Sequence, residues 1–505
     1  MAIFPSVFLF LLAVGLGLLT ILTRRKIKES YIDFRAIAYS YDLMSSSFRP
    51  GQNTYHFSIL GNPVVGLKGQ QARKVFFNER SFSTSEGYKV FSKAAPVPEL
   101  AKTLLSAEEG HGLHFKKQLE ILVNKNRLAD SKQQIATYSR HIFEYTTVIA
   151  TMLGDMQRIT ATWNNKGSMD PFDKINDITF HVTAHMITSN DFVSDSVKFS
   201  QFQTHFFTQL KNNTPAMIFL PWFYRKSQRE KEIAITSLFT TLTSYIEVRE
   251  KYKISTSEPI DLLLDHGMNS QEIIQFILGF LFGGVYNATK AISWILIYIS
   301  MHSQWKMAIR SEVEDLLSKH SFDISKPLHS RLSEVPLEAW EESLPTLDLV
   351  ISETFRLVMN QTVLRRNIGE DVEIPGGQGH VPSGAFVAYS NADAHLEPEI
   401  YDDPWSFKPD RFEHGKQKVL SNDFLGWGAG RHRCVGLGIA KLTIKTIVCL
   451  FVMTYDYDIT RTKRKSNPTI PTPDHNKVNQ VSVLEKCTAY RFIKILIRRH
   501  AQRVK

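Results

Sequence analysis

The first strong pattern in the chain is an uncharged apolar stretch from Ile3 to Leu22. Its twenty residues are mostly Leu, Phe, Val, Ile, Ala and Gly. At a rise of about 1.5 Å per residue, one helix of this length crosses a hydrocarbon core of about 30 Å. Four basic residues follow the stretch between positions 24 and 28. This order favours an uncleaved anchor over a signal peptide, and it keeps the basic flank in the cytosol.

After the anchor, the hydrophobic pattern alternates between strand and helix signals. Tyr55–Leu67 alternates and contains Gly61-Asn62-Pro63, which predicts a β-hairpin with its turn at these three residues. Residues 100–355 carry Leu, Ile and Phe at spacings of three and four, which is typical of helices. Val363–Tyr389 returns to short strands broken by Pro and Gly. The pattern predicts a mainly α fold with minor β structure.

A second apolar segment, Ile273–Met301, could compete as a membrane span. Its 29 residues are interrupted by Gln275, Asn287 and Lys290, so the longest clean run is shorter than a usual span. We therefore predict a buried central helix in a large domain.

Composition narrows the class of protein. The chain has 505 residues with ordinary globular composition, so collagen, wholesale disorder and disulfide scaffolds are excluded. Its three cysteines, Cys434, Cys449 and Cys487, have no metal-clip spacing, which favours a reducing compartment. The net charge of +10 suits a membrane surface or an acidic partner and does not require nucleic acid.

The richest chemical signal surrounds Cys434. Four glycines lie within eleven residues, from Gly426 to Gly436, beside three basic or potentially basic side chains. Glycines let the backbone approach a large planar ligand. Positive charge and a following helix lower a thiol pKa, so we expect a thiolate here. Cys449 and Cys487 lack such surroundings and are expected to be inert.

This loop resembles the haem-binding loop of the cytochrome P450 family. The matching residues are Trp427, Gly430, His432, Cys434 and Gly436. Trp and His replace the usual Phe and Arg, as in the branch with sterol demethylases, bile-acid hydroxylases and prostacyclin synthase. The resemblance implies haem b with iron ligated by the Cys434 thiolate, and haem contacts from Trp427, Gly428, His432 and Gly436.

Two further matches have the family's order and spacing. Glu353 and Arg356 lie three residues apart on one predicted helix face, and Arg411 lies in Pro409-Asp410-Arg411-Phe412. The resemblance implies that these three residues form a buried structural ion-pair triad. It also implies the family's fold, a triangular α-helical domain with small β-sheets around haem. We expect an anchor at residues 1–23, a linker at 24–50 and the catalytic domain at 51–505.

One arginine and His432 are expected to bind the haem propionates. The family places this arginine after the Glu-x-x-Arg helix, which favours Arg366 over Arg365. The common Trp-x-x-x-Arg is missing around residues 111–123, where a lysine could substitute or simply lie on a solvated helix face.

The central helix departs from the family at its catalytic positions. Gly283 and Gly284 keep the expected oxygen groove, but Asn287 stands where the family has an alcohol and Tyr286 where it has an acid. An amide does not exchange protons readily, although it can orient water. Asn287 could instead satisfy a buried backbone carbonyl. Thr289 lies about 200° round the helix and cannot replace it.

The resemblance implies a monooxygenase of the endoplasmic reticulum that inserts one oxygen atom from O2 into an apolar small molecule. The general look of the chain resembles fungal enzymes that make alkaloids, diketopiperazines, terpenoids or sterol-like secondary metabolites. NADPH-cytochrome P450 reductase is the implied electron donor, with cytochrome b5 as a second candidate. The expected docking surface comprises Arg431, Arg433, Lys441 and Lys445.

Two other functions stay open. One is an isomerase or dehydratase acting without a reductase, and the other is a haem sensor or a membrane binding protein without enzymatic activity. The expected substrate walls are Ser85–Leu100, Met217–Tyr224, Phe280, Tyr286, Gln361–Leu364 and Val478–Val483.

Overall fold

The computed structural model describes most of the chain after the expected linker. The described residues are 44, 48, 52–59, 62–88, 135–163, 166–210, 225–254, 256, 258–376, 379–413, 423–461, 473 and 493–499. The expected anchor, nearly all of the linker, the segment 111–123 and Cys487 lie outside them. So do the expected substrate walls at 217–224 and 478–483 and most of 85–100.

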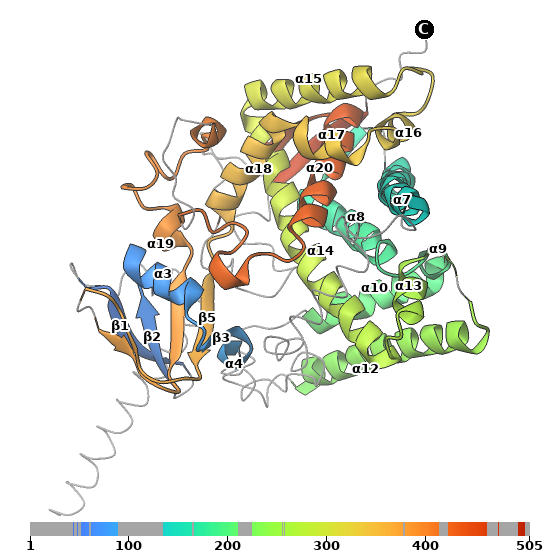
Figure 1. Cartoon of the computed structure of the whole chain (residues 1–505). Coiled ribbons are helices and arrows are strands. Elements are labelled where there is room, and N and C mark those ends of the chain that lie inside the picture. Colours follow the sequence, from blue (N-terminus) through green and yellow to red (C-terminus); the bar gives the residue numbers. More distant parts are fainter. Residues whose placement is uncertain are drawn as a thin grey trace, which may run out of the picture.

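The central element is α14 (Ser270–Met301), which runs through the helical part of the molecule (Figure 1). It begins at a capping box in which the side chain of Asn269 accepts from the Glu272 amide and Glu272 accepts in return. Helices α8 (Pro171–His185), α18 (Pro345–Val358) and α20 (Leu437–Thr454) pack against it. The predicted buried central helix is confirmed.

Two described helices are long and apolar enough to cross a bilayer by length and composition alone. They are α14 and α20, and most of each helix's apolar window is buried inside the protein. Core helices of this kind satisfy the same criterion.

The other described helices are α3 (Gln70–Asn78), α4 (Thr84–Tyr88), α7 (Ile135–Ala161), α9 (Asn190–Ser194), α10 (Ser196–Leu210), α12 (Arg225–Lys251), α13 (Pro259–Asp265), α15 (Ser303–His320), α16 (Leu328–Ser333), α17 (Leu337–Glu342) and α19 (Ala392–His395). Most of them lie around this centre, whereas α3, α4 and α19 lie beside the β-strands (Figure 1). The helical prediction for residues 100–355 is confirmed where the chain is described, except at strand β4 (Lys166–Met169).

The main sheet has the strand order β1-β2-β8-β5-β3 and lies to one side of the helices (Figure 1). Its strands are β1 (Thr54–Ile59), β2 (Asn62–Leu67), β3 (Phe82–Ser83), β5 (Thr362–Asn367) and β8 (Phe386–Ser390). The predicted hairpin is confirmed as β1 and β2, but Asn62 and Pro63 begin β2 and are not turn residues, because Asn62 pairs with Ile59.

Two smaller sheets complete the β structure. One has the order β4-β10-β9, with β9 at Tyr455–Arg461 and β10 at Ile493–Arg499. The other pairs β6 (Val372–Glu373) with β7 (His380–Val381). The predicted strand region after position 362 is therefore confirmed.

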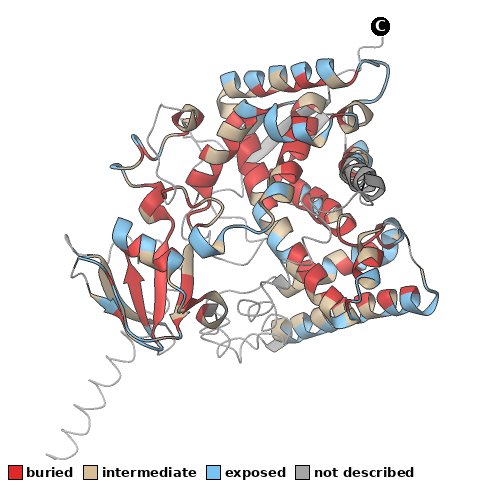
Figure 2. Cartoon of the chain, in the orientation of Figure 1, coloured by how far each residue is buried: buried red, intermediate tan, exposed pale blue. Residues whose placement is uncertain are grey.

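Buried residues line α14, α18, α20 and the middle of the main sheet (Figure 2). Apolar clusters join α14 to α18 and α20, and join its first half to α10 and α12. A third cluster lies between α3 and the main sheet. This packing places the Cys434 loop, which precedes α20, between the helical core and α3.

Candidate functional site

The Cys434 loop is a tight glycine turn that leads into α20. The Cys434 amide donates to the Trp427 carbonyl at 2.8 Å, which closes the loop. Gly428 has φ +69°, and a Cβ there would lie 2.4 Å from the carbonyl oxygen of His432. Gly430 has φ +57°, and a Cβ there would lie 2.4 Å from the carbonyl oxygen of Phe77. Both positions therefore require glycine.

Cys434 is exposed as a residue. The surrounding chain atoms nevertheless desolvate its thiol enough to raise the thiol pKa. A hydrogen bond from the Gly436 amide opposes this shift without overcoming it. In the chain by itself, burial therefore opposes the expected thiolate. A metal ion would have to supply the remaining stabilisation of the anion, as metals do for coordinating thiols.

Two contacts fix the first half of the loop. The Trp427 ring stacks on Phe355 of α18, with ring centroids 4.1 Å apart. The Leu425 amide donates to Nε2 of His395 at 2.8 Å, so Nδ1 carries the proton that is shared with Asn360 Oδ1 at 2.9 Å. Sequence reasoning missed His395 and Asn360, because no pattern links residues that lie 35 positions apart.

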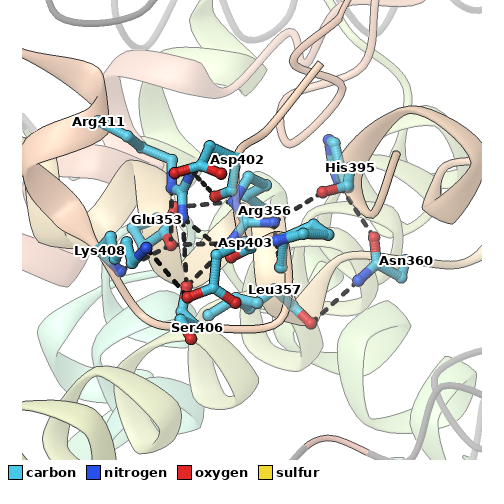
Figure 3. A network of polar contacts seen from close by, with 11 residues as sticks. Glu353, Arg356, Leu357, Asn360, His395, Asp402, Asp403, Ser406, Lys408 and Arg411 are labelled. Carbon is cyan, nitrogen blue, oxygen red and sulfur yellow. Dashed lines mark hydrogen bonds and ion pairs between the residues drawn. The ribbon is translucent and has the colours of Figure 1, made fainter. Parts of the chain in front are cut away.

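The structure brings Glu353, Arg356 and Arg411 together in a buried network (Figure 3). Glu353 accepts from Nε and Nη2 of Arg356, each at 2.8 Å, and from Nε of Arg411 at 3.2 Å. The Lys408 amide adds a fourth bond to Glu353 at 2.9 Å.

The outer nitrogens of the two arginines bind backbone carbonyls of the last residue of α19 and of the segment that follows it (Figure 3). Arg356 Nη1 reaches the carbonyls of His395 and Pro404, each at 2.7 Å, and Arg411 Nη1 reaches that of Asp402 at 2.8 Å. The network thus connects α18 to the segment that leads toward the Cys434 loop.

The middle of α14 has an open face although the helix is otherwise largely buried. Phe282, Gly283 and Asn287 are exposed, and a Cβ on Gly283 would meet no described atom within 4 Å. Gly284 behaves differently, because a Cβ there would lie 3.1 Å from Thr183 Cγ2 of α8. Gly283 therefore provides open space, and Gly284 permits close helix packing.

Asn287 donates to the Gly283 carbonyl at 3.3 Å from an exposed position. This bond uses a donor of the amide and leaves its oxygen as an acceptor. The carbonyl that Asn287 satisfies is therefore not a buried one. Thr289 lies on the opposite face, buried, with its hydroxyl 2.5 Å from that of Thr179, so the prediction that it cannot replace Asn287 is confirmed.

The start of α20 lies near α14, because the two helices pack together and Ile439 packs against a cluster that includes the first half of α14. An exposed cysteine, a glycine turn and an open glycine-asparagine helix face thus belong to adjoining elements. This donor set fits haem, which needs one axial thiolate and space on its opposite face.

The two candidate propionate arginines point to different surroundings. Arg365 is buried, donates to the Phe76 carbonyl and lies 4.4 Å from the Phe76 ring centroid. Arg366 is 41% exposed, donates to the Gly384 carbonyl at 3.0 Å and faces Glu86 at 3.8 Å. Arg366 is the more accessible guanidinium.

One part of the expected docking surface is wrong. Lys445 is 3% exposed, and its ammonium donates to Asp348 at 2.8 Å and to the Trp340 carbonyl at 3.0 Å. It therefore anchors α20 to α17 and α18 and cannot meet a partner. Arg431 and Arg433 are exposed, and Lys441 is 37% exposed.

Comparison with known proteins gives a consistent result. A model of the cytochrome P450 family matches residues 41–480. The cytochrome P450 monooxygenase AacuE of Aspergillus aculeatus is 25% identical over 413 residues, which is 80% of this chain and 79% of the relative. The monooxygenase nsrP of Aspergillus novofumigatus is 25% identical over 402 residues, 78% of this chain and 74% of the relative.

More distant relatives extend this match. A sterol 14α-demethylase of Mycolicibacterium vanbaalenii is 24% identical over 416 residues, 80% of this chain and 83% of the relative. The solved structure of retinoic acid-bound cyanobacterial CYP120A1 superposes with a TM-score of 0.66 at 19% identity, covering 92% of this chain and 96% of the other. At this identity the structural match shows the fold.

Proposed function

The chain belongs to the cytochrome P450 family, and from this premise we propose that it oxygenates an apolar small molecule of fungal secondary metabolism. The family binds haem through a cysteine thiolate, and its fungal relatives are monooxygenases, so the enzyme is an oxidoreductase. The observation that carries the proposal is the exposed residue Cys434, presented by a glycine turn at the start of α20, a helix that packs against α14.

Each residue has a defined task in this proposal. Cys434 holds the iron, Arg366 and His432 bind the propionates, and Trp427 holds the loop against Phe355. When bound, the haem supplies the iron chemistry that activates dioxygen.

On α14, the open space at Gly283 would leave room for a small ligand and a water molecule. The Asn287 oxygen accepts a hydrogen bond from that water and orients it, while water itself carries the proton. This arrangement assigns positioning, and not acid catalysis, to the amide.

Replacing Asn287 with alanine should therefore lower the yield of oxygenated product per NADPH by about 100-fold, the lower end of the range for positioned proton-transfer groups. Haem content should be unchanged, because Asn287 is exposed and its hydrogen bond to the Gly283 carbonyl lies within α14. Product per NADPH is measured with Asn287→Thr as the matched variant, which restores an alcohol and should retain most of the yield. An alanine variant that forms as much product per NADPH as the wild type would contradict this role.

The electron donor in this proposal is NADPH-cytochrome P450 reductase, with cytochrome b5 as a second candidate. Exposed Arg431 and Arg433 lie next to Cys434 and offer positive charge to an acidic flavin domain. Residues 1–23 hold the enzyme on the endoplasmic reticulum as a single-pass anchor, with residues 51–505 in the cytosol.

Replacing Arg433 with glutamate should raise the KM for reductase several-fold and make turnover less sensitive to salt, because screening acts on the same attraction. Lys198→Glu is the control, since Lys198 is 78% exposed and lies on α10, which is separate from α20 and the Cys434 loop (Figure 1). Turnover with reductase is measured at rising ionic strength. Equal effects of the two variants would exclude this docking surface.

Labelled dioxygen distinguishes monooxygenation from the reductase-independent alternative. The full chain with reductase and NADPH should place one labelled oxygen atom in the product and consume NADPH. Product formed from a peroxide without NADPH and without label would instead establish an isomerase, the function that Asn287 and Trp427 also permit.

A further inference from the structure

A second cluster of potential metal ligands lies away from the Cys434 loop. Asp155 comes from α7, and His181 and His185 come from α8, which lies between α7 and α14 (Figure 1). One ligand atom from each residue lies within 4.8 Å of the other two. His185 Nδ1 is 2.6 Å from Asp155 Oδ2, and His181 Nε2 is 3.7 Å from the same oxygen.

The helix geometry explains why the two imidazoles meet. Residues four positions apart on α8 lie on the same face, so His181 and His185 both point to α7. Two imidazoles and a carboxylate form a ligand set that suits first-row divalent ions, Zn²⁺ among them. Here the shortest distance between two ligand atoms is 2.6 Å, from His185 Nδ1 to Asp155 Oδ2, and all three ligand atoms lie within 4.8 Å of one another. Atoms that bind one ion through bonds of about 2.0–2.2 Å have separations between these two distances.

Burial distinguishes this cluster from a surface group of acids. The side chains of Asp155 and His185 are 1% and 8% exposed, and that of His181 is 18% exposed. Within the described part of the chain, the buried Nε2 of His181 has no hydrogen-bond partner. It points toward the Asp155 oxygen but lies too far away to bond to it. A buried nitrogen without a hydrogen-bond partner costs free energy of folding, and coordination to a bound ion would give this nitrogen a partner.

An ordinary ion pair does not account for the whole cluster. Arg158 contacts Asp155 through Oδ1, whereas both histidines face Oδ2. The Arg158 side chain is 58% exposed, so it can stay in solvent while the other oxygen binds an ion.

We propose that Asp155, His181 and His185 form a second metal site, separate from the haem, that binds a first-row divalent ion such as Zn²⁺. The ion takes Oδ2 of Asp155, Nε2 of His181 and Nδ1 of His185, and water completes the coordination. It bridges α7 and α8.

The site is connected to α14 through α8. The face of α8 opposite the histidines carries Thr179, which contacts Thr289, and Thr183, which packs against Gly284. An ion that fixes α8 to α7 therefore stabilises the support behind the Gly283–Asn287 segment. Its role is structural, because its ligands do not face the open side of α14.

The test measures metal on the purified full-length protein, isolated with an affinity tag that contains no histidine. The protein is stripped with a mild chelator, incubated with Zn²⁺ alone, separated from free ion and analysed for zinc and iron. The wild type should hold about one zinc per iron, and Zn²⁺ should raise its Tm. His181→Gln should weaken zinc binding more than about 100-fold, beyond the usual loss for an outer-shell change.

His181→Gln is the primary variant because it leaves the bond between Asp155 and His185 intact. His266→Gln is the control, since His266 is exposed near the end of α13. It should bind zinc as the wild type does. Equal zinc content in the wild type and His181→Gln would overturn the proposal and leave a hydrogen-bonded Asp-His pair. A haem spectrum that is the same in both proteins shows that folding is not the cause.

Discussion

Replacing Glu353 with glutamine should destabilise the protein by about 3–5 kcal/mol, the range for breaking one side of a buried ion pair. Glu353 and Arg356 are fully buried, and Arg411 is 4% exposed. The carboxylate accepts four donated hydrogen bonds, so a glutamine NH2 group would face donors and leave two guanidinium charges uncompensated.

The loss should also reach the Cys434 loop, because Arg356 binds the His395 carbonyl and the His395 ring holds the Leu425 amide. Thermal unfolding and haem content of the purified variant measure both effects. Glu314→Gln is the matched control, since Glu314 forms an exposed helical pair with Arg310 and should change stability by less than about 0.5 kcal/mol. Similar losses of stability in Glu353→Gln and Glu314→Gln would show that the burial of Glu353 does not set its contribution to stability.

Replacing Cys434 with serine should reduce oxygenation to the level seen without enzyme. A serine hydroxyl is a far weaker acid than a thiol, and its oxygen is a harder ligand than sulfur. It therefore cannot supply the electron donation to iron that favours O–O cleavage. The surrounding fold should survive, because the loop is closed by the backbone bond from position 434 to Trp427 and by the Trp427–Phe355 stack. Product formation with reductase and NADPH measures this loss.

Cys449→Ala is the control for a general effect of losing a cysteine. Cys449 is fully buried in α20, and burial raises its thiol pKa strongly, so it stays a small apolar group. Its replacement should cost about 1 kcal/mol of stability and keep product formation. Wild-type product formation by Cys434→Ser would show that another residue serves the reaction.

Local patterns predicted the elements of the fold well. The alternation in Tyr55–Leu67 indicates a hairpin but not its register, since Asn62 and Pro63 already pair with β1, and the mostly apolar pattern of α14 indicates a core helix. The spacing of Glu353 and Arg356 specifies their contact within one helix, whereas the contact of Glu353 with Arg411 depends on how two distant segments pack. That contact was predicted only through the family resemblance.

Other features depend on tertiary packing and leave no signal in a local window. Lys445 has the sequence of a surface lysine, but α17 and α18 cover it and supply its acceptors. The thiol pKa of Cys434 depends on desolvation by residues around the loop, which charge counting does not describe. Asp155 meets His185 across thirty positions, because α7 and α8 pack together.

The most direct test of the account is the ferrous carbonyl spectrum of the purified full-length protein and of Cys434→Ser. The wild type should show the Soret maximum characteristic of thiolate-ligated haem, and the serine variant should lose it. A thiolate-type maximum that persists in Cys434→Ser, or a wild type that never shows one, would contradict the assignment of Cys434 as the iron ligand.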